Sequence, residues 1–205
     1  ASNAFGATNQ SVTLTIAKGT PVISNWPSAS PIAFGQALSN SVLSGGLANP
    51  TGNFTWTVPT NRPNSGTNLQ SVTFTPSATN NYSTATNTVS LVVNKASPVL
   101  TWTPSPATGL TYPAPLSSTQ LNATSSVAGS FSYNPISGTV LNVGTNTLVA
   151  TFTPSNTTNY SSGGATTNTV VVGKGSNVIT FNSIPVRYLD EVSFTLNATP
   201  SSGLA

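Results

Sequence analysis

The feature that most constrains the fold of this chain is an internal repeat. The stretch "FTPSATNNYSTATNTV" begins at Phe74 and returns as "FTPSNTTNYSSGGATTNTV" at Phe152. Tyr82 and Tyr160 hold the same place in the two copies, and the spacing is about 78 residues. A fixed period of this length indicates that one folding unit is used more than once, so the fold of one period decides the architecture.

A lysine follows an alternating stretch once in each period. The stretches "VTLTIAK", "VSLVVNK" and "VVVGK" end at Lys18, Lys95 and Lys174. In the first of them, apolar and polar residues alternate, which is the period of a half-buried strand. We therefore predict a closing strand of a preceding repeat, two complete repeats and the opening strands of a third, over residues 1–18, 19–95, 96–174 and 175–205.

Within one period the sequence predicts strands only. Short runs rich in Val, Thr, Phe and Tyr are separated by clusters of Pro, Gly, Asn and Ser, and no segment has helical spacing. About seven short strands per period predict an all-β fold of tandem immunoglobulin-like sandwiches. Trp56 lies where such sandwiches keep a core tryptophan. The repeat is marked by Trp56, Phe74, Tyr82, Phe152 and Tyr160.

Charge is almost missing from the composition. Charged residues make up 3% of the chain, against roughly 25% in an average soluble protein. The hydrophobic content of 37% is nevertheless enough to fill cores of this size. The five cations are spread along the chain, so we expect no nucleic-acid partner. No apolar run approaches the length of a membrane span, and we expect none in this stretch of chain.

The sequence contains few side chains of the types that carry out catalysis. Without His and Cys, neither Ser–His nor thiol chemistry can be built, and zinc lacks its usual ligands. The two acids, Asp190 and Glu191, are adjacent and would point to opposite faces of a strand. We therefore predict no enzyme activity, no catalytic residues, no metal site and no cofactor.

Two tryptophans are candidate surface contacts. Trp102 occupies the first strand of its repeat, at the place taken by Phe181 in the third repeat, whereas Trp26 is displaced by one residue. Such a displacement moves a side chain to the opposite face of a strand unless a bulge absorbs it. Both rings therefore have two interpretations, packing in a core or junction, or contact with a carbohydrate.

Several linked motifs carry a family resemblance. After the lysines come "PVI" or "PVL", and the second repeat continues through "LSSTQLNAT", "GSFSY" and "FTPSNTTNYSS". This pattern resembles the bacterial immunoglobulin-like repeats, of the MBG-type and Big-type, found in large surface or extracellular proteins. The resemblance implies tandem sandwiches in a protein located at the cell surface or outside the cell. It implies stalk or adhesive scaffold roles, and it supplies no catalytic residues.

Low charge also bears on partners. Edge strands of sheets are usually protected by charged side chains, and near-neutral copies do not repel one another. We therefore expect a structural module of a stalk or fibre, assembled by β-strand and apolar contacts with other copies of itself or neighbouring repeats. The alternative is an adhesin that binds a glycan or a host surface protein through loops and exposed aromatic residues.

Overall fold

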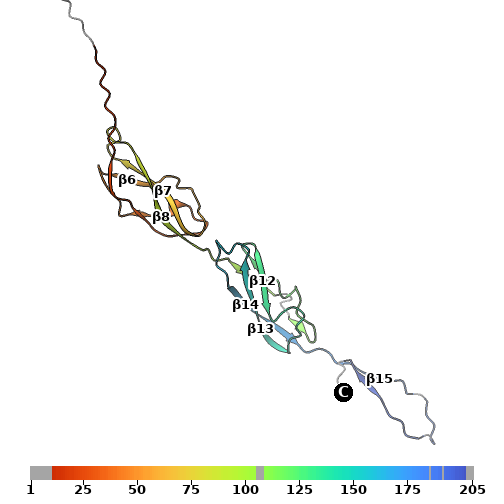
Figure 1. Ribbon diagram of the computed structural model, residues 1–205. Coiled ribbons are helices and arrows are strands. Elements are labelled where there is room, and N and C mark those ends of the chain that lie inside the picture. The colour runs from red at the N-terminus through yellow and green to blue at the C-terminus, as the bar shows by residue number, and fades with distance from the viewer. Residues whose placement is uncertain (1–10, 105–108, 185, 191, 202–205) are drawn as a thin grey trace, which may run out of the picture. The chain divides into compact units, whose positions relative to one another are not determined.

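A computed structural model describes residues 11–104, 109–184, 186–190 and 192–201. Over these residues the protein is all-β, with short and long strands and one 3₁₀ helix (Figure 1). No helix in this described part is long and apolar enough to cross a membrane. The chain divides into two compact units, Ala1–Ser97 with Asn156–Ser161, and Pro98–Ser155 with Ser162–Ala205.

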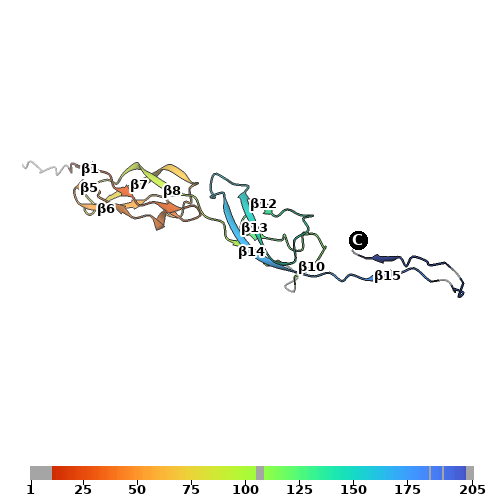
Figure 2. The same cartoon turned by 90° about the horizontal axis from the view of Figure 1, so that it is seen from below.

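The first unit is built around a four-stranded sheet with the order β3-β8-β7-β6. Strand β3 runs parallel to β8, and the other neighbours are antiparallel. The antiparallel pair β1–β5 (Figure 2) and the antiparallel pair β2–β4 complete the unit. Its elements are β1 (Val22–Asn25), β2 (Ser28–Ala29), β3 (Ile32–Ala33), η1 (Leu38–Asn40), β4 (Leu43–Ser44), β5 (Leu47–Asn49), β6 (Gly52–Trp56), β7 (Gly66–Pro76) and β8 (Ala85–Asn94).

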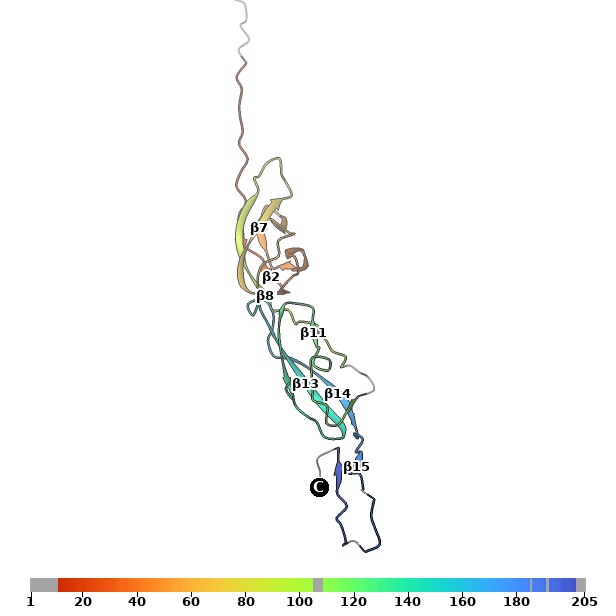
Figure 3. The same ribbon diagram turned by 90° about the vertical axis from the view of Figure 1, so that its right-hand side faces the viewer.

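The second unit has a four-stranded sheet with the order β10-β14-β13-β12. Strand β10 is parallel to β14 and the rest are antiparallel, as in the first unit. The pairs β9–β11 and β15–β16 are antiparallel. Strands β11 and β15 are labelled in Figure 3. Its strands are β9 (Leu100–Thr101), β10 (Leu110–Thr111), β11 (Thr124–Ser125), β12 (Gly129–Asn134), β13 (Gly144–Pro154), β14 (Gly164–Gly173), β15 (Ile179–Phe181) and β16 (Ala198–Pro200).

The long hairpins of the two units match residue by residue. In the first unit Gly66 pairs with Val93, and in the second Gly144 pairs with Val172. Both glycines have a positive φ, 118° and 119°, which side chains rarely adopt. The sequence repeat therefore corresponds to one strand order used twice.

Alternation along the strands builds the two cores. On β7 the buried residues alternate with more exposed ones toward its end, as a period of two requires. The smaller strand pairs also contribute, because Ala29 of β2 and Leu43 of β4 pack against the first core. Sheets around a shared core fit a β-sandwich. The buried clusters comprise Ile32, Leu38, Trp56, Val72, Val89, Leu91 and Val93 in one unit, and Trp102, Leu116, Leu121, Leu141, Leu148, Ala150, Val170 and Val172 in the other.

Residues 11–18 belong to no strand of the described chain. Their alternating apolar side chains, Val12, Leu14 and Ile16, are between 81% and 89% exposed. Since a strand becomes half-buried only where a sheet receives it, the predicted closing strand of a preceding repeat stays a prediction.

Candidate functional site

Trp102 lies in the core of the second unit. It follows β9 directly and is only 9% exposed. Its Nε1 donates a hydrogen bond to the carbonyl oxygen of Gln120 at 2.9 Å, and the ring of Tyr133 is 5.7 Å away. A buried indole whose N–H is satisfied is a packing element.

Trp26 is half-buried and belongs to the first core. Its ring meets Phe54 edge-on at 5.6 Å. The pairing of β1 with β5 is irregular between Ile23 and Asn25, where the pairing register shifts. A bulge of this kind absorbs a one-residue displacement, and it explains how Trp26 reaches the core despite its shifted position.

Trp56 ends the edge strand β6 and is 7% exposed. Its Nε1 donates to the carbonyl oxygen of Ser41 at 3.1 Å. Each unit therefore uses one indole to satisfy a backbone carbonyl within its core, Trp56 in the first and Trp102 in the second. Phe54 lies two residues before Trp56 on the same face and packs on the core.

Phe74 and Phe152, which open the repeated stretch, are the largest fully buried side chains. Phe74 pairs across the sheet with Phe54, and Phe152 pairs with Phe131, at ring distances of 4.8 and 4.9 Å. Cross-strand aromatic pairs stabilise a sheet beyond their area. The repeated phenylalanine is therefore a structural residue of each hairpin.

Tyr82 and Tyr160 lie in corners closed by backbone hydrogen bonds. The Gly19 amide donates to the Asn81 carbonyl at 2.8 Å, and the Ser83 amide donates to the Gly19 carbonyl at 2.9 Å. Ala96 makes the same two bonds with Asn159 and Ser161, at 3.0 and 2.9 Å. The two corners thus share one backbone arrangement.

The corner of residues 156–161 holds a polar site built from backbone and side-chain groups. Asn159 is 6% exposed. Its Oδ1 accepts a hydrogen bond from the Ser65 amide at 2.8 Å, and its Nδ2 donates to Asn64 Oδ1 at 3.1 Å. Lys95 Nζ donates to the Thr157 carbonyl at 2.6 Å. All of these residues are members of the first compact unit.

An aromatic contact accompanies these hydrogen bonds. The rings of Tyr160 and Phe34 meet edge-on at 5.4 Å. Sequence reasoning singled out Tyr160, but it did not place Phe34, Asn64, Ser65 and Asn159 in one site with it. The available signal was the return of Asn64 and Asn81 at the repeat spacing, as Asn142 and Asn159.

Groups suited to chemistry are sparse in the described part of the chain. There, no group of three or more His, Cys, Asp or Glu could hold a metal ion. Asp190 lies in a turn, and Glu191 lies outside the described residues. The guanidinium of Arg187 stacks over the Phe194 ring at 4.6 Å. This arrangement supports packing rather than proton transfer.

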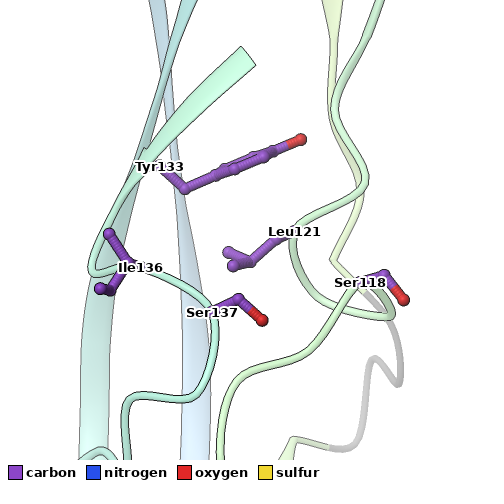
Figure 4. A pocket seen from close by; sticks show the side chains of 5 residues that line it. All are labelled: Ser118, Leu121, Tyr133, Ile136 and Ser137. Carbon is purple, nitrogen blue, oxygen red and sulfur yellow. The ribbon is translucent and has the colours of Figure 1, made fainter. Parts of the chain in front are cut away.

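A shallow apolar cavity of about 270 Å³ opens in the second unit (Figure 4). It is lined by Ser118, Leu121, Tyr133, Ile136 and Ser137. The Tyr133 hydroxyl already accepts a hydrogen bond from the Ala123 amide at 3.0 Å. Since the lining has no charged group, the cavity offers shape but little means of orienting a polar ligand.

Comparison of the sequence with protein-family models and with curated proteins finds no match. The arguments on function therefore rest on the geometry of the chain.

Proposed function

We propose that this chain is a structural module of a long extracellular or cell-surface repeat protein. Its units act as immunoglobulin-like domains of a stalk or fibre, and copies of the chain associate through β-strand and apolar contacts. The observation that carries the proposal is the use of one strand order twice, with the same parallel and antiparallel neighbours in each unit. Each repeated folding unit makes the protein longer and adds no reactive groups.

The sheet edges support association. Strands β6 and β12 are the outer strands of the two four-stranded sheets. Their sequences, "GNFTW" and "GSFSYN", contain no charged residue. An edge strand offers unpaired N–H and C=O groups, and lysine is the common protection against pairing. These edges lack that protection.

The charge balance points the same way. The chain has five cations, two acids and a net charge of +3 over 205 residues. Self-repulsion between copies is therefore weak. Association by backbone pairing and apolar contact should also be nearly independent of salt, since only charge interactions are screened.

Light scattering and electron microscopy of the purified chain test this proposal. We expect growth into extended assemblies as concentration rises, with little difference between low and physiological salt. A chain that stays monomeric at the highest attainable concentration would overturn the proposal.

The adhesin alternative requires exposed aromatic rings. Trp102 is buried and offers no free ring face, whereas Trp26 is half-buried and meets Phe54 edge-on. Binding of the chain to a glycan array, lost in Trp26→Ala with folding unchanged, would favour the adhesin instead.

A further inference from the structure

The outer strands β6 and β12 leave the two cores incompletely covered at the same edge. In the second unit, the cavity of about 270 Å³ lies at the end of β12, and Tyr133 and Leu121 reach into it from different segments of the chain (Figure 4). In the first unit, a cavity of about 370 Å³ lies at the end of β6, and its lining includes Leu43, Phe54 and Trp56. Neither lining contains a charged residue. The two units therefore share an apolar opening beside the outer strand of the four-stranded sheet.

This open edge is a feature of the repeated unit. A second repeat follows β6 along the chain, and a first repeat precedes β12. Among the described strands, the following repeat adds no strand to β6, and the preceding repeat adds none to β12. A neighbouring repeat therefore does not extend the sheet at this edge.

Hydrogen bonding to β13 uses every second residue of β12. The Ser155 amide donates to the Ala128 carbonyl at 3.0 Å, and these two residues continue the register of the β12–β13 pair. In an antiparallel pair, residues that exchange hydrogen bonds alternate with residues that do not. The backbone groups of Ser130 and Ser132 therefore bond to β13.

The residues between them have backbone groups that point away from the sheet. The N–H and C=O groups of Gly129, Phe131 and Tyr133 face the open edge, where no strand of the described chain pairs with them. The side chains of Phe131 and Tyr133 turn toward the core and are half-buried. The edge thus combines free backbone groups with partly exposed apolar rings.

The absence of charge indicates which partner this edge accepts. No charged residue lies between Lys95 and Lys174. In a two-fold contact, residues near the axis meet their own copies, so a charge there would face a like charge across the strands. The uncharged edge of β12 therefore suits a second copy of the chain. A partner recognised by its charge would find no opposite charge on β12.

We propose that the β12 edges of two copies pair in antiparallel orientation, with Phe131 opposite Phe131 of the second copy. This register places Gly129 opposite Tyr133 of the second copy, so the outward N–H and C=O groups of both strands all have partners. A shift by two residues places either Gly129 or Tyr133 opposite a residue beyond the end of the strand. The inference rests on the proposed self-association and names the edge, orientation and register that carry it.

The side chains fit this register on both faces of the joined sheet. On the core face, Phe131 lies beside Phe131 of the second copy, and cross-strand aromatic pairs stabilise a sheet. On the outer face, Ser130 lies opposite Ser132 of the second copy, where two hydroxyl groups share a hydrogen bond. The two edges also cover each other, which removes apolar surface from water.

The contact is isologous, because the same strand contributes on both sides, and it joins two chains. The first unit has an uncharged outer strand of the same kind, β6. A chain that pairs through both edges joins two neighbours. Two different two-fold contacts in one chain therefore build an open assembly, as a fibre requires.

Disulfide crosslinking in the full chain tests the register, because the chain has no cysteine of its own. Directly opposite residues are close enough for a disulfide, whereas diagonal neighbours are about 7–8 Å apart. Under mild oxidation, an equal mixture of Ser130→Cys and Ser132→Cys chains should form dimers roughly fivefold faster than either variant alone. Ser162→Cys mixed with Ser132→Cys is the matched control, because Ser162 is exposed outside the strands, and this mixture should crosslink slowly.

A lysine on the edge tests the contact by a second route. Ser132→Lys places a charge on the open edge and should raise the dissociation constant, measured by sedimentation velocity, roughly fivefold to tenfold. Thr147→Lys adds the same charge at an exposed position of the inner strand β13 and should leave association unchanged. Thermal unfolding of both variants checks that the fold is kept.

Other outcomes overturn distinct claims. If the chain associates but all cysteine mixtures crosslink at one rate, or the two lysine variants behave alike, the edge contact is overturned and the proposed function stands. Faster crosslinking of one variant with itself would overturn the register. A chain that does not associate would overturn the proposed function. In that case, one crosslinking rate for all mixtures at the highest attainable concentration would overturn the inference as well.

Discussion

Gly129 lies directly beneath the ring of Phe152. A Cβ atom at Gly129 would approach Cε2 of Phe152 to 2.6 Å and would also meet the Thr153 carbonyl oxygen. The first unit repeats this relationship between Gly52 and Phe74, with Cζ of the ring at 2.6 Å. The same packing contact between a buried phenylalanine and a glycine therefore occurs once in each unit.

The first prediction concerns this glycine–phenylalanine contact. Gly129→Ala should lower the free energy of unfolding by about 1–3 kcal/mol, because the added methyl group forces the ring or the strand to move. Urea unfolding followed by far-UV circular dichroism measures the change. Gly164→Ala is the control, since its Cβ would meet only a Leu100 methyl at 3.6 Å. Equal stability of both variants would contradict the packing account.

The second prediction concerns Trp102. Trp102→Phe keeps an aromatic ring but removes the N–H that satisfies the Gln120 carbonyl. We expect a loss of about 1–3 kcal/mol from the lost buried hydrogen bond together with the space left by the smaller ring. Thermal and urea unfolding check it. Tyr188→Phe, at a side chain that is 75% exposed, should change stability very little. If Trp102→Phe leaves the free energy of unfolding unchanged, the indole N–H does not contribute to stability.

A third prediction uses the two equivalent asparagines. Asn159→Ala removes a buried side chain that binds Asn64 and Ser65, and should destabilise the chain by about 1–3 kcal/mol. Asn81→Ala changes an exposed equivalent and should stay within about 0.5 kcal/mol. Urea unfolding of the two variants side by side is the measurement. Similar losses of stability in both variants would show that the asparagine side chain stabilises the corner whether or not it is buried.

The fourth prediction concerns residues 11–18. Leu14→Lys and Ile16→Lys should reduce association without changing the free energy of unfolding, because these apolar side chains are exposed and an added charge opposes apolar contact and strand pairing between copies. Sedimentation velocity measures association. Val186→Lys, at another exposed position, should leave association unchanged. Reduced association in all three variants would indicate a general effect of net charge.

Much of the fold was predictable from the sequence. Alternation and turn residues predicted an all-β chain, and the repeat at Phe74 and Phe152 predicted that one folding unit is used more than once. The burial of Trp102 was left open. A strand end can turn a ring either way, and the Gln120 carbonyl that receives its N–H lies 18 residues away.

The burial of Asn159 was not predictable. Asn81 and Asn159 have the same neighbours, Tyr and Ser, yet one is exposed and the other is buried. The difference arises because residues 64 and 65 cover Asn159, from 95 and 94 positions away along the chain. Local sequence contains no information on such a partner, since the repeat offers the same motif at both places.

Immunogold electron microscopy of the native assembly, with an antibody against this chain, tests the central claim most directly. A structural module of a surface repeat protein predicts label at regular intervals along filaments or stalks outside the cell. Label confined to the cell interior, or to separate compact particles, would contradict the account.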